Sequence, residues 1–141
     1  MINSSLVRAI VLCSAAIGVA ACHRSGAARP VIAGLPVGMT LQTIAQGDSL
    51  FHARSCVRCH GADAKGAQNG PDLTTSKHLH VNGTYDDFVR LITSGVPKDS
   101  IKVSSHRFAM QPRGGTQSPL TDEQIRAVAA FVYSLSHRPG T

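Results

Sequence analysis

The stretch Cys56-Val57-Arg58-Cys59-His60 decides the fold prediction, because it places two thiols and one imidazole within a single short segment. With four Cys and seven His in 141 residues, shuffling this composition yields the spacing about 0.005 times per chain. Two cysteines three positions apart also lie about one helical turn from each other. The pattern therefore indicates a site in which both thiols and the imidazole act together.

The spacing suits the covalent attachment of a haem. Two thiols one turn apart can reach the two vinyl groups on one edge of a porphyrin and form thioethers, and the following imidazole then lies beneath the iron. A thioredoxin-like dithiol and part of a zinc site are alternatives that use the same atoms. The first expects a βαβ setting, which is not evident, and the second lacks a fourth ligand. We predict one haem c, attached through Cys56 and Cys59 and ligated by His60.

A ligand for the opposite face of the iron is predicted by elimination among three methionines. Met1 lies in a predicted export signal and Met39 in a predicted tether, which leaves Met110. Met110 is followed by Pro112 and a glycine pair, and such an irregular loop can direct a thioether inward. We therefore predict Met110 as the second axial ligand. A core methionine that fills a gap is the alternative.

Histidines offer further candidates for this second ligand. His78, His80 and His106 could each reach an iron in principle, although most such side chains are solvated or hydrogen-bonded at the surface. His106 lies four residues before Met110, so it could replace that ligand if the loop rearranged. His52 is expected on the surface of the first helix.

The chain resembles the bacterial class I cytochrome c family, which carries one haem, over approximately residues 41–138. The likeness rests on a helix leading into Cys56-x-x-Cys59-His60-Gly61, on Gly70-Pro71-Asp72-Leu73, on Met110 in a Pro/Gly loop and on an apolar C-terminal helix. The resemblance implies an all-α cytochrome c fold, with three to five short helices around one covalently attached haem. It also implies that the Pro71 carbonyl accepts a hydrogen bond from Nδ1 of His60 and so orients this ligand.

The resemblance further implies a close crossing of the first and last helices. Gly47 matches the position at the crossing, and Phe51 and Phe131 match the aromatic positions beside it. Aromatic residues make up only 4% of the chain, so the core lacks the large side chains that usually fill it. A bound group is therefore expected to supply part of that bulk.

Local signals predict the helices independently of this resemblance. Thr121 and Gln124 form a capping-box pattern before an apolar repeat with helical spacing, which Pro139 ends. Thr84 and Asp87 open another segment whose apolar residues share one face. No convincing pair of alternating strands is present. The sequence thus predicts an all-α domain.

The first residues predict export. Arg8 is followed by an apolar stretch over residues 9–21, which is typical of a signal peptide and shorter than the ~20 residues of a membrane-spanning helix. Val19-Ala20-Ala21-Cys22 resembles a lipobox, in which the cysteine is lipidated; ordinary cleavage with an incidental Cys22 is the alternative. We predict a signal peptide at 1–21, a flexible tether at 22–40, the cytochrome c domain at 41–138 and a tail at 139–141. The protein would then be periplasmic and held at a membrane by Cys22.

Charge narrows the choice of partners. Fourteen Lys plus Arg against eight Asp plus Glu give a net charge of +6, and the cations form no run, which argues against nucleic-acid binding. Loss of the signal removes Arg8 and leaves 13 minus 8, or +5. The loop 96–109 is cationic and either docks a partner or is solvated. Its basic residues are Lys98, Lys102, His106 and Arg107.

The predicted function follows from the two axial ligands. If His60 and Met110 both bind the iron, no position stays open for oxygen, peroxide or substrate, so the site suits electron transfer and not catalysis. We predict a one-electron carrier between respiratory or periplasmic redox proteins, namely a dehydrogenase, reductase or oxidase with an acidic docking surface. Two alternatives stay open. One is a haem relay subunit of a dehydrogenase complex, and the other is a haem enzyme or gas sensor with a displaceable sixth ligand.

Overall fold

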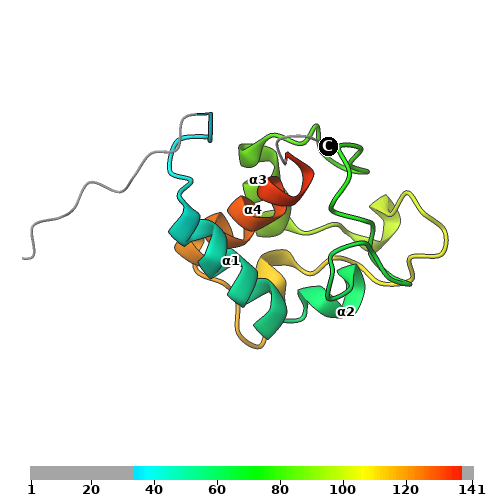
Figure 1. Cartoon of the computed structure of the whole chain (residues 1–141). Coiled ribbons are helices and arrows are strands. Elements are labelled where there is room, and N and C mark those ends of the chain that lie inside the picture. The colour runs from blue at the N-terminus through cyan, green and yellow to red at the C-terminus, as the bar shows by residue number, and fades with distance from the viewer. Residues whose placement is uncertain (1–33, 138–141) are drawn as a thin grey trace, which may run out of the picture.

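The computed structural model describes residues 34–137 (Figure 1). The helices are α1 (Leu41–Ala53), α2 (Cys56–His60), α3 (Tyr85–Ser94), the 3-10 helices η1 (Lys98–Ser100) and η2 (Pro112–Gly114), and α4 (Asp122–Ser136). Within the described range, extended pairing is limited to two isolated bridges, Ala67 with Gly70 and Val96 with Met110. The predicted all-α fold is confirmed.

Capping boxes begin three of the helices. Thr121 caps α4 with Gln124, and Thr84 caps α3 with Asp87, as the sequence predicts. A further box begins α1, where the Thr43 hydroxyl accepts from Thr40 N at 2.8 Å. The third helical position of a capping box is usually acidic or an amide, and here it is a threonine. The sequence pattern therefore did not predict this box.

Helices α1 and α4 cross at Gly47 (Figure 1). A Cβ on Gly47 would lie 1.9 Å from the carbonyl oxygen of Ala127, so only glycine permits this approach. Beside the crossing, the rings of Phe51 and Phe131 have centroids 5.4 Å apart, and Phe51 is 1% exposed. The crossing that the resemblance implied is therefore present.

Helix α3 packs against α4 through a cluster of buried apolar side chains. The cluster consists of Phe88, Ile92, Leu120, Ile125, Val128, Ala129 and Val132. A second cluster under α1 contains Phe51, Ala64 and Leu135. Burial of such side chains is the main favourable term in folding. The two clusters hold α1, α3 and α4 together and leave α2 and the connecting loops to enclose the site.

Buried residues occur directly before α1. Met39 and Thr40, inside the range predicted as a tether, are only 2% and 7% exposed, and Met39 N donates to Pro36 O at 3.0 Å. The predicted signal, Cys22 and the tail at 139–141 lie outside the described residues. Among residues 34–137, no helix has the length and apolar character required to cross a membrane.

Candidate functional site

The five residues singled out by the sequence lie on the wall of one cavity of about 450 Å³. Cys56, Cys59 and His60 come from α2, Pro71 from the following loop, and Met110 from the loop before η2. Pockets of this size bind cofactor-sized molecules. The remaining wall is largely apolar and includes Phe88, Leu91, Ile92, Val96, Leu120, Val128 and Val132.

Helix α2 presents the two cysteines to this cavity. Cys56 and Cys59 are free thiols of intermediate exposure, and their spacing of three residues places them on one face of the helix. Burial raises the pKa of the Cys56 thiol above its usual value of 9.0. Both sulfurs are therefore available on the cavity wall and are not consumed in a disulfide.

The ring of His60 is held by the loop that follows α2. Its Nδ1 lies 3.0 Å from the carbonyl oxygen of Pro71, which is the contact that the resemblance implied. Burial lowers the pKa of His60, so the neutral ring is favoured. Because the carbonyl can only accept, Nδ1 carries the proton and Nε2 keeps its lone pair. That lone pair is the kind of donor that binds a metal ion.

Glycines bring this loop close to α2. A Cβ on Gly70 would lie 2.5 Å from the Cys59 carbonyl oxygen and 3.0 Å from Nδ1 of His60. Gly66 N donates to the His60 carbonyl oxygen at 2.8 Å, and Gly66 has a φ of +88°, which glycine adopts readily. The backbone therefore approaches closely enough for Pro71 to reach the imidazole.

Met110 is held by a backbone bridge to the end of α3. Val96 N donates to Met110 O at 2.9 Å, and Met110 N donates to Val96 O at 3.0 Å. Gly95 precedes this bridge with a φ of +69°, and a Cβ there would lie 2.2 Å from Met110 O. The side chain of Met110 is half-buried and packs against the α3–α4 cluster.

The three alternative histidines also reach the cavity wall, so the cavity collects every axial candidate that the described residues offer except Met39. Burial lowers the pKa values of His78 and His80. His78 packs edge-on against Phe88 with centroids 4.8 Å apart, and its buried Nε2 has no hydrogen-bond partner among residues 34–137. A buried polar atom without a partner is unfavourable, and a group bound in the cavity could supply one.

The cationic loop is partly folded by its own lysines. Lys98 Nζ donates to the carbonyl oxygen of Arg107, and Lys102 Nζ donates to that of Leu79 at 2.5 Å. Arg107 N donates to Asn69 Oδ1 at 3.2 Å. Phe108, next along the chain, is 65% exposed. The loop thus has a defined path and still presents charge and one aromatic ring at the surface.

His52 has a role that sequence reasoning missed. Its side chain is 45% exposed, as expected, but its Nδ1 lies 2.9 Å from the Asp48 carbonyl and its Nε2 lies 2.8 Å from the Ala62 carbonyl. The two carbonyls and the adjacent Asp48 carboxylate raise the pKa of His52. The ring therefore ties α1 to the loop behind α2.

These features define a class: a small all-α domain in which paired thiols and an oriented imidazole line an apolar cavity. The cytochrome c family model matches residues 44–136, more than half of the chain. The chain therefore belongs to the cytochrome c family. Membership implies that this domain binds haem covalently and transfers electrons through it.

Individual relatives support this assignment. The chain is 36% identical over 103 residues to the cbb3-type cytochrome c oxidase subunit CcoP of Rubrivivax gelatinosus, covering 70% of this chain and 28% of that subunit. It is also 36% identical over 103 residues to the fructose dehydrogenase cytochrome subunit of Gluconobacter japonicus, covering 67% and 19% of the two chains. The chain thus spans less than a third of the length of either relative.

A solved structure supports the fold. Cytochrome cL from Methylophaga aminisulfidivorans MPT is similar with a TM-score of 0.51 at 24% identity, covering 71% of this chain and 61% of that one.

The residues on the cavity wall fit a covalently bound haem. Two free thiols on one helical face, a neutral imidazole with a free lone pair, a thioether and a largely apolar wall are the donor set that the group requires. The unpartnered Nε2 of His78 beside the same cavity agrees with a bound group there.

Proposed function

We propose that the protein is a one-electron carrier with a single haem c, attached through Cys56 and Cys59 and ligated axially by His60 and Met110. The observation that carries this proposal is that all four side chains line one apolar cavity while Pro71 fixes the His60 ring. When bound, the haem supplies a reversible one-electron couple.

The chain's own residues favour electron transfer over catalysis at this site. If His60 and Met110 both held the haem iron, no ligand position would stay open for a substrate, and the largely apolar wall would disfavour the entry of water. As a ligand, the Met110 thioether would favour the reduced form of the haem, and the largely apolar surroundings, which disfavour extra charge, would do the same. Hydrogen bonds with Pro71 and Val96 hold the His60 and Met110 segments, so the chain would need little rearrangement when a bound haem gained or lost an electron.

Substitution of Met110 by alanine tests the ligand assignment. The weak near-infrared sulfur-to-iron band of the oxidised protein should be present in the wild type and lost in Met110→Ala. Met39→Ala is the control, because it removes a thioether that is 2% exposed and does not line the cavity, and it should retain the band. Persistence of the band in Met110→Ala would overturn the assignment. Carbon monoxide binding by the reduced wild type at neutral pH would instead favour a gas sensor or haem enzyme.

Export and membrane attachment form part of the proposal. Residues 1–21 act as the signal peptide, Cys22 is lipidated, and residues 22–40 connect the membrane to the domain; the apolar stretch and lipobox-like sequence support this. The wild type should fractionate with membranes and carry the mass of a lipid. Cys22→Ala should be found in the soluble periplasmic fraction. Equal fractionation of the two would contradict lipidation.

We propose partners with acidic docking surfaces, on a dehydrogenase, reductase or oxidase. The charge of +5 that remains after loss of the signal supports this choice, as do the exposed basic residues of the 96–109 loop. Charge-steered encounters slow as salt screens the charges. Electron-transfer rates should therefore fall with rising ionic strength, and rates that do not respond to salt would contradict the proposal.

A relay subunit within a larger complex is the second candidate. It is favoured by the two relatives, of which one is an oxidase subunit and the other a dehydrogenase cytochrome subunit. Gentle purification of the tagged protein from its own cells should then recover a stoichiometric redox enzyme. Recovery of the cytochrome alone, with full electron-transfer activity, favours the free carrier.

A further inference from the structure

Arg113 has the most unusual backbone conformation in the loop that carries Met110. It lies in η2 with φ +54° and ψ 28°, in the left-handed region that residues other than glycine rarely adopt. Its neighbours are Pro112 and Gly114. Since an arginine keeps such a conformation only where its surroundings hold it, the contacts of its side chain explain its presence.

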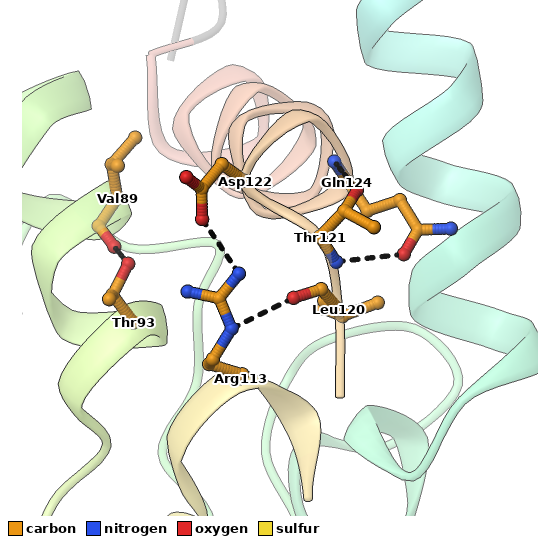
Figure 2. Close-up of polar contacts among 7 residues, drawn as sticks. All are labelled: Val89, Thr93, Arg113, Leu120, Thr121, Asp122 and Gln124. Carbon is orange, nitrogen blue, oxygen red and sulfur yellow. Dashed lines mark hydrogen bonds and ion pairs between the residues drawn. The ribbon is translucent and has the colours of Figure 1, made fainter. Parts of the chain in front are cut away.

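The Arg113 side chain binds the beginning of α4 (Figure 2). Its Nε donates to Leu120 O at 2.9 Å, and its Nη2 donates to Asp122 Oδ1 at 2.7 Å. In return, Leu120 N donates to Arg113 O at 2.9 Å. The Arg113 guanidinium lowers the pKa of the Asp122 carboxyl, so this pair is charged near neutral pH. Arg113 is thus joined to α4 through both its backbone and its side chain.

Other contacts hold the same loop from its remaining sides. The backbone bridge to Val96 fixes Met110 at the end of α3, and Ser55 Oγ donates to Gly114 O at 2.9 Å. Ser55 directly precedes the first cysteine of α2. Only two residues separate Met110 from Arg113, so the methionine lies on a short segment fixed between α3 and α4.

We propose that Arg113 is a positioning residue for Met110. By binding Leu120 O and Asp122, it holds the C-terminal side of the Met110 segment against α4, so that the thioether keeps its place when another ligand competes. Without this anchor, the glycines that follow would let the segment move away from the cavity. The inference rests on the proposed function, in which Met110 ligates the iron.

Competition by imidazole tests this role in the haem-containing protein. Arg113→Asn keeps tolerance of the left-handed backbone and removes the guanidinium. The apparent Kd of the oxidised protein for imidazole, followed by loss of the near-infrared band, should fall about tenfold. The control is Arg126→Gln, which removes a charge from an exposed residue of α4 and should stay within about twofold of the wild type.

Conservative variants separate positioning from general stability. Arg113→Lys keeps the positive charge but loses the guanidinium that binds both Leu120 O and Asp122. Asp122→Asn removes only the negative charge that faces Arg113. In both variants the imidazole Kd should lie between those of the wild type and Arg113→Asn. Hydrogen exchange at the Leu120 amide should quicken in Arg113→Asn. If Arg113→Asn has a lowered unfolding midpoint but an imidazole Kd equal to that of Arg126→Gln, Arg113 contributes only to general stability. This result would overturn the inference.

Two further outcomes are distinguishable. If Arg113→Asn does not take up haem, Arg113→Lys and Asp122→Asn test the inference instead. An imidazole Kd equal to that of the wild type in both variants would overturn it. If the band survives in Met110→Ala, the proposed ligation fails. If the band is lost there but Arg113→Asn behaves like Arg126→Gln, the ligation stands and only the role of Arg113 fails.

Discussion

The imidazole Nδ1 of His60 and the carbonyl oxygen of Pro71 lie 3.0 Å apart, although 11 positions separate them in the chain. The contact orients the ring and selects the tautomer whose Nε2 is free. It depends on the close approach of backbone at Gly70, where no side chain fits between the loop and α2.

Substitution of Gly70 by alanine should disturb this contact. The new Cβ would lie 2.5 Å from the Cys59 carbonyl oxygen, so the loop must move away from α2. We expect a loss of about 1–3 kcal/mol in the free energy of unfolding, measured with denaturant. Gly38→Ala is the control, since its φ of +87° gives backbone strain with no atom within 4 Å. A loss no larger than that of the control would show that the close approach is unimportant.

Gly47→Ala should weaken the crossing of α1 and α4. Alanine is ordinarily the better helix former by about 1 kcal/mol, but its Cβ would lie 1.9 Å from the Ala127 carbonyl oxygen. We expect a net loss of about 2–4 kcal/mol in unfolding free energy. The exposed neighbour Gln46 provides the control, since Gln46→Ala should change stability by less than about 0.5 kcal/mol. Unchanged stability in Gly47→Ala would mean that the helices can separate without cost.

His52 should make stability depend on pH. Both ring nitrogens face oxygen acceptors, so only the protonated ring satisfies both, and its pKa lies above the usual 6.5. The stabilisation of the folded protein by protonated His52 is complete below pH 6.5. It disappears as the pH rises through the pKa of His52 in the folded state. The melting temperature should therefore fall over that window in the wild type. The fall should be smaller in His52→Gln, and equal profiles would rule out this link.

Thr84→Ala should remove the cap of α3 and raise the pKa of Asp87. The Thr84 hydroxyl is the largest cause of the lowered pKa of Asp87, so that pKa, measured by NMR, should rise toward 3.8. The loss of the cap should cost about 1 kcal/mol in unfolding free energy. In the wild type, the stabilisation from Asp87 is complete above pH 3.8 and is lost as the pH falls through the lower folded-state value.

Thr93→Ala is the matched control for this cap. The Thr93 hydroxyl donates to the Val89 carbonyl one turn earlier in α3, at 2.7 Å (Figure 2). Such a contact adds little to a helix, so alanine there should be neutral or slightly stabilising. If both threonine variants lose equal stability, the capping box is not the cause.

The sequence by itself determined the features whose causes lie within one helical turn. The capping pairs at Thr84 and Thr121 needed only residues three positions apart, and the cysteine–histidine motif needed only the positions of its own members. The Pro71 contact was reached through family resemblance. Ligation by Met110 and lipidation at Cys22 stay predictions.

Only the tertiary structure decided the contacts between segments distant in the chain. The contacts of His52 with Ala62, of Val96 with Met110 and of Arg113 with Asp122 each join groups nine or more positions apart in the chain. Neither periodicity nor capping chemistry carries information about such pairs. The physical reason is that packing of α1, α3 and α4 around the cavity brings these groups within hydrogen-bonding distance, and this packing is a property of the whole domain.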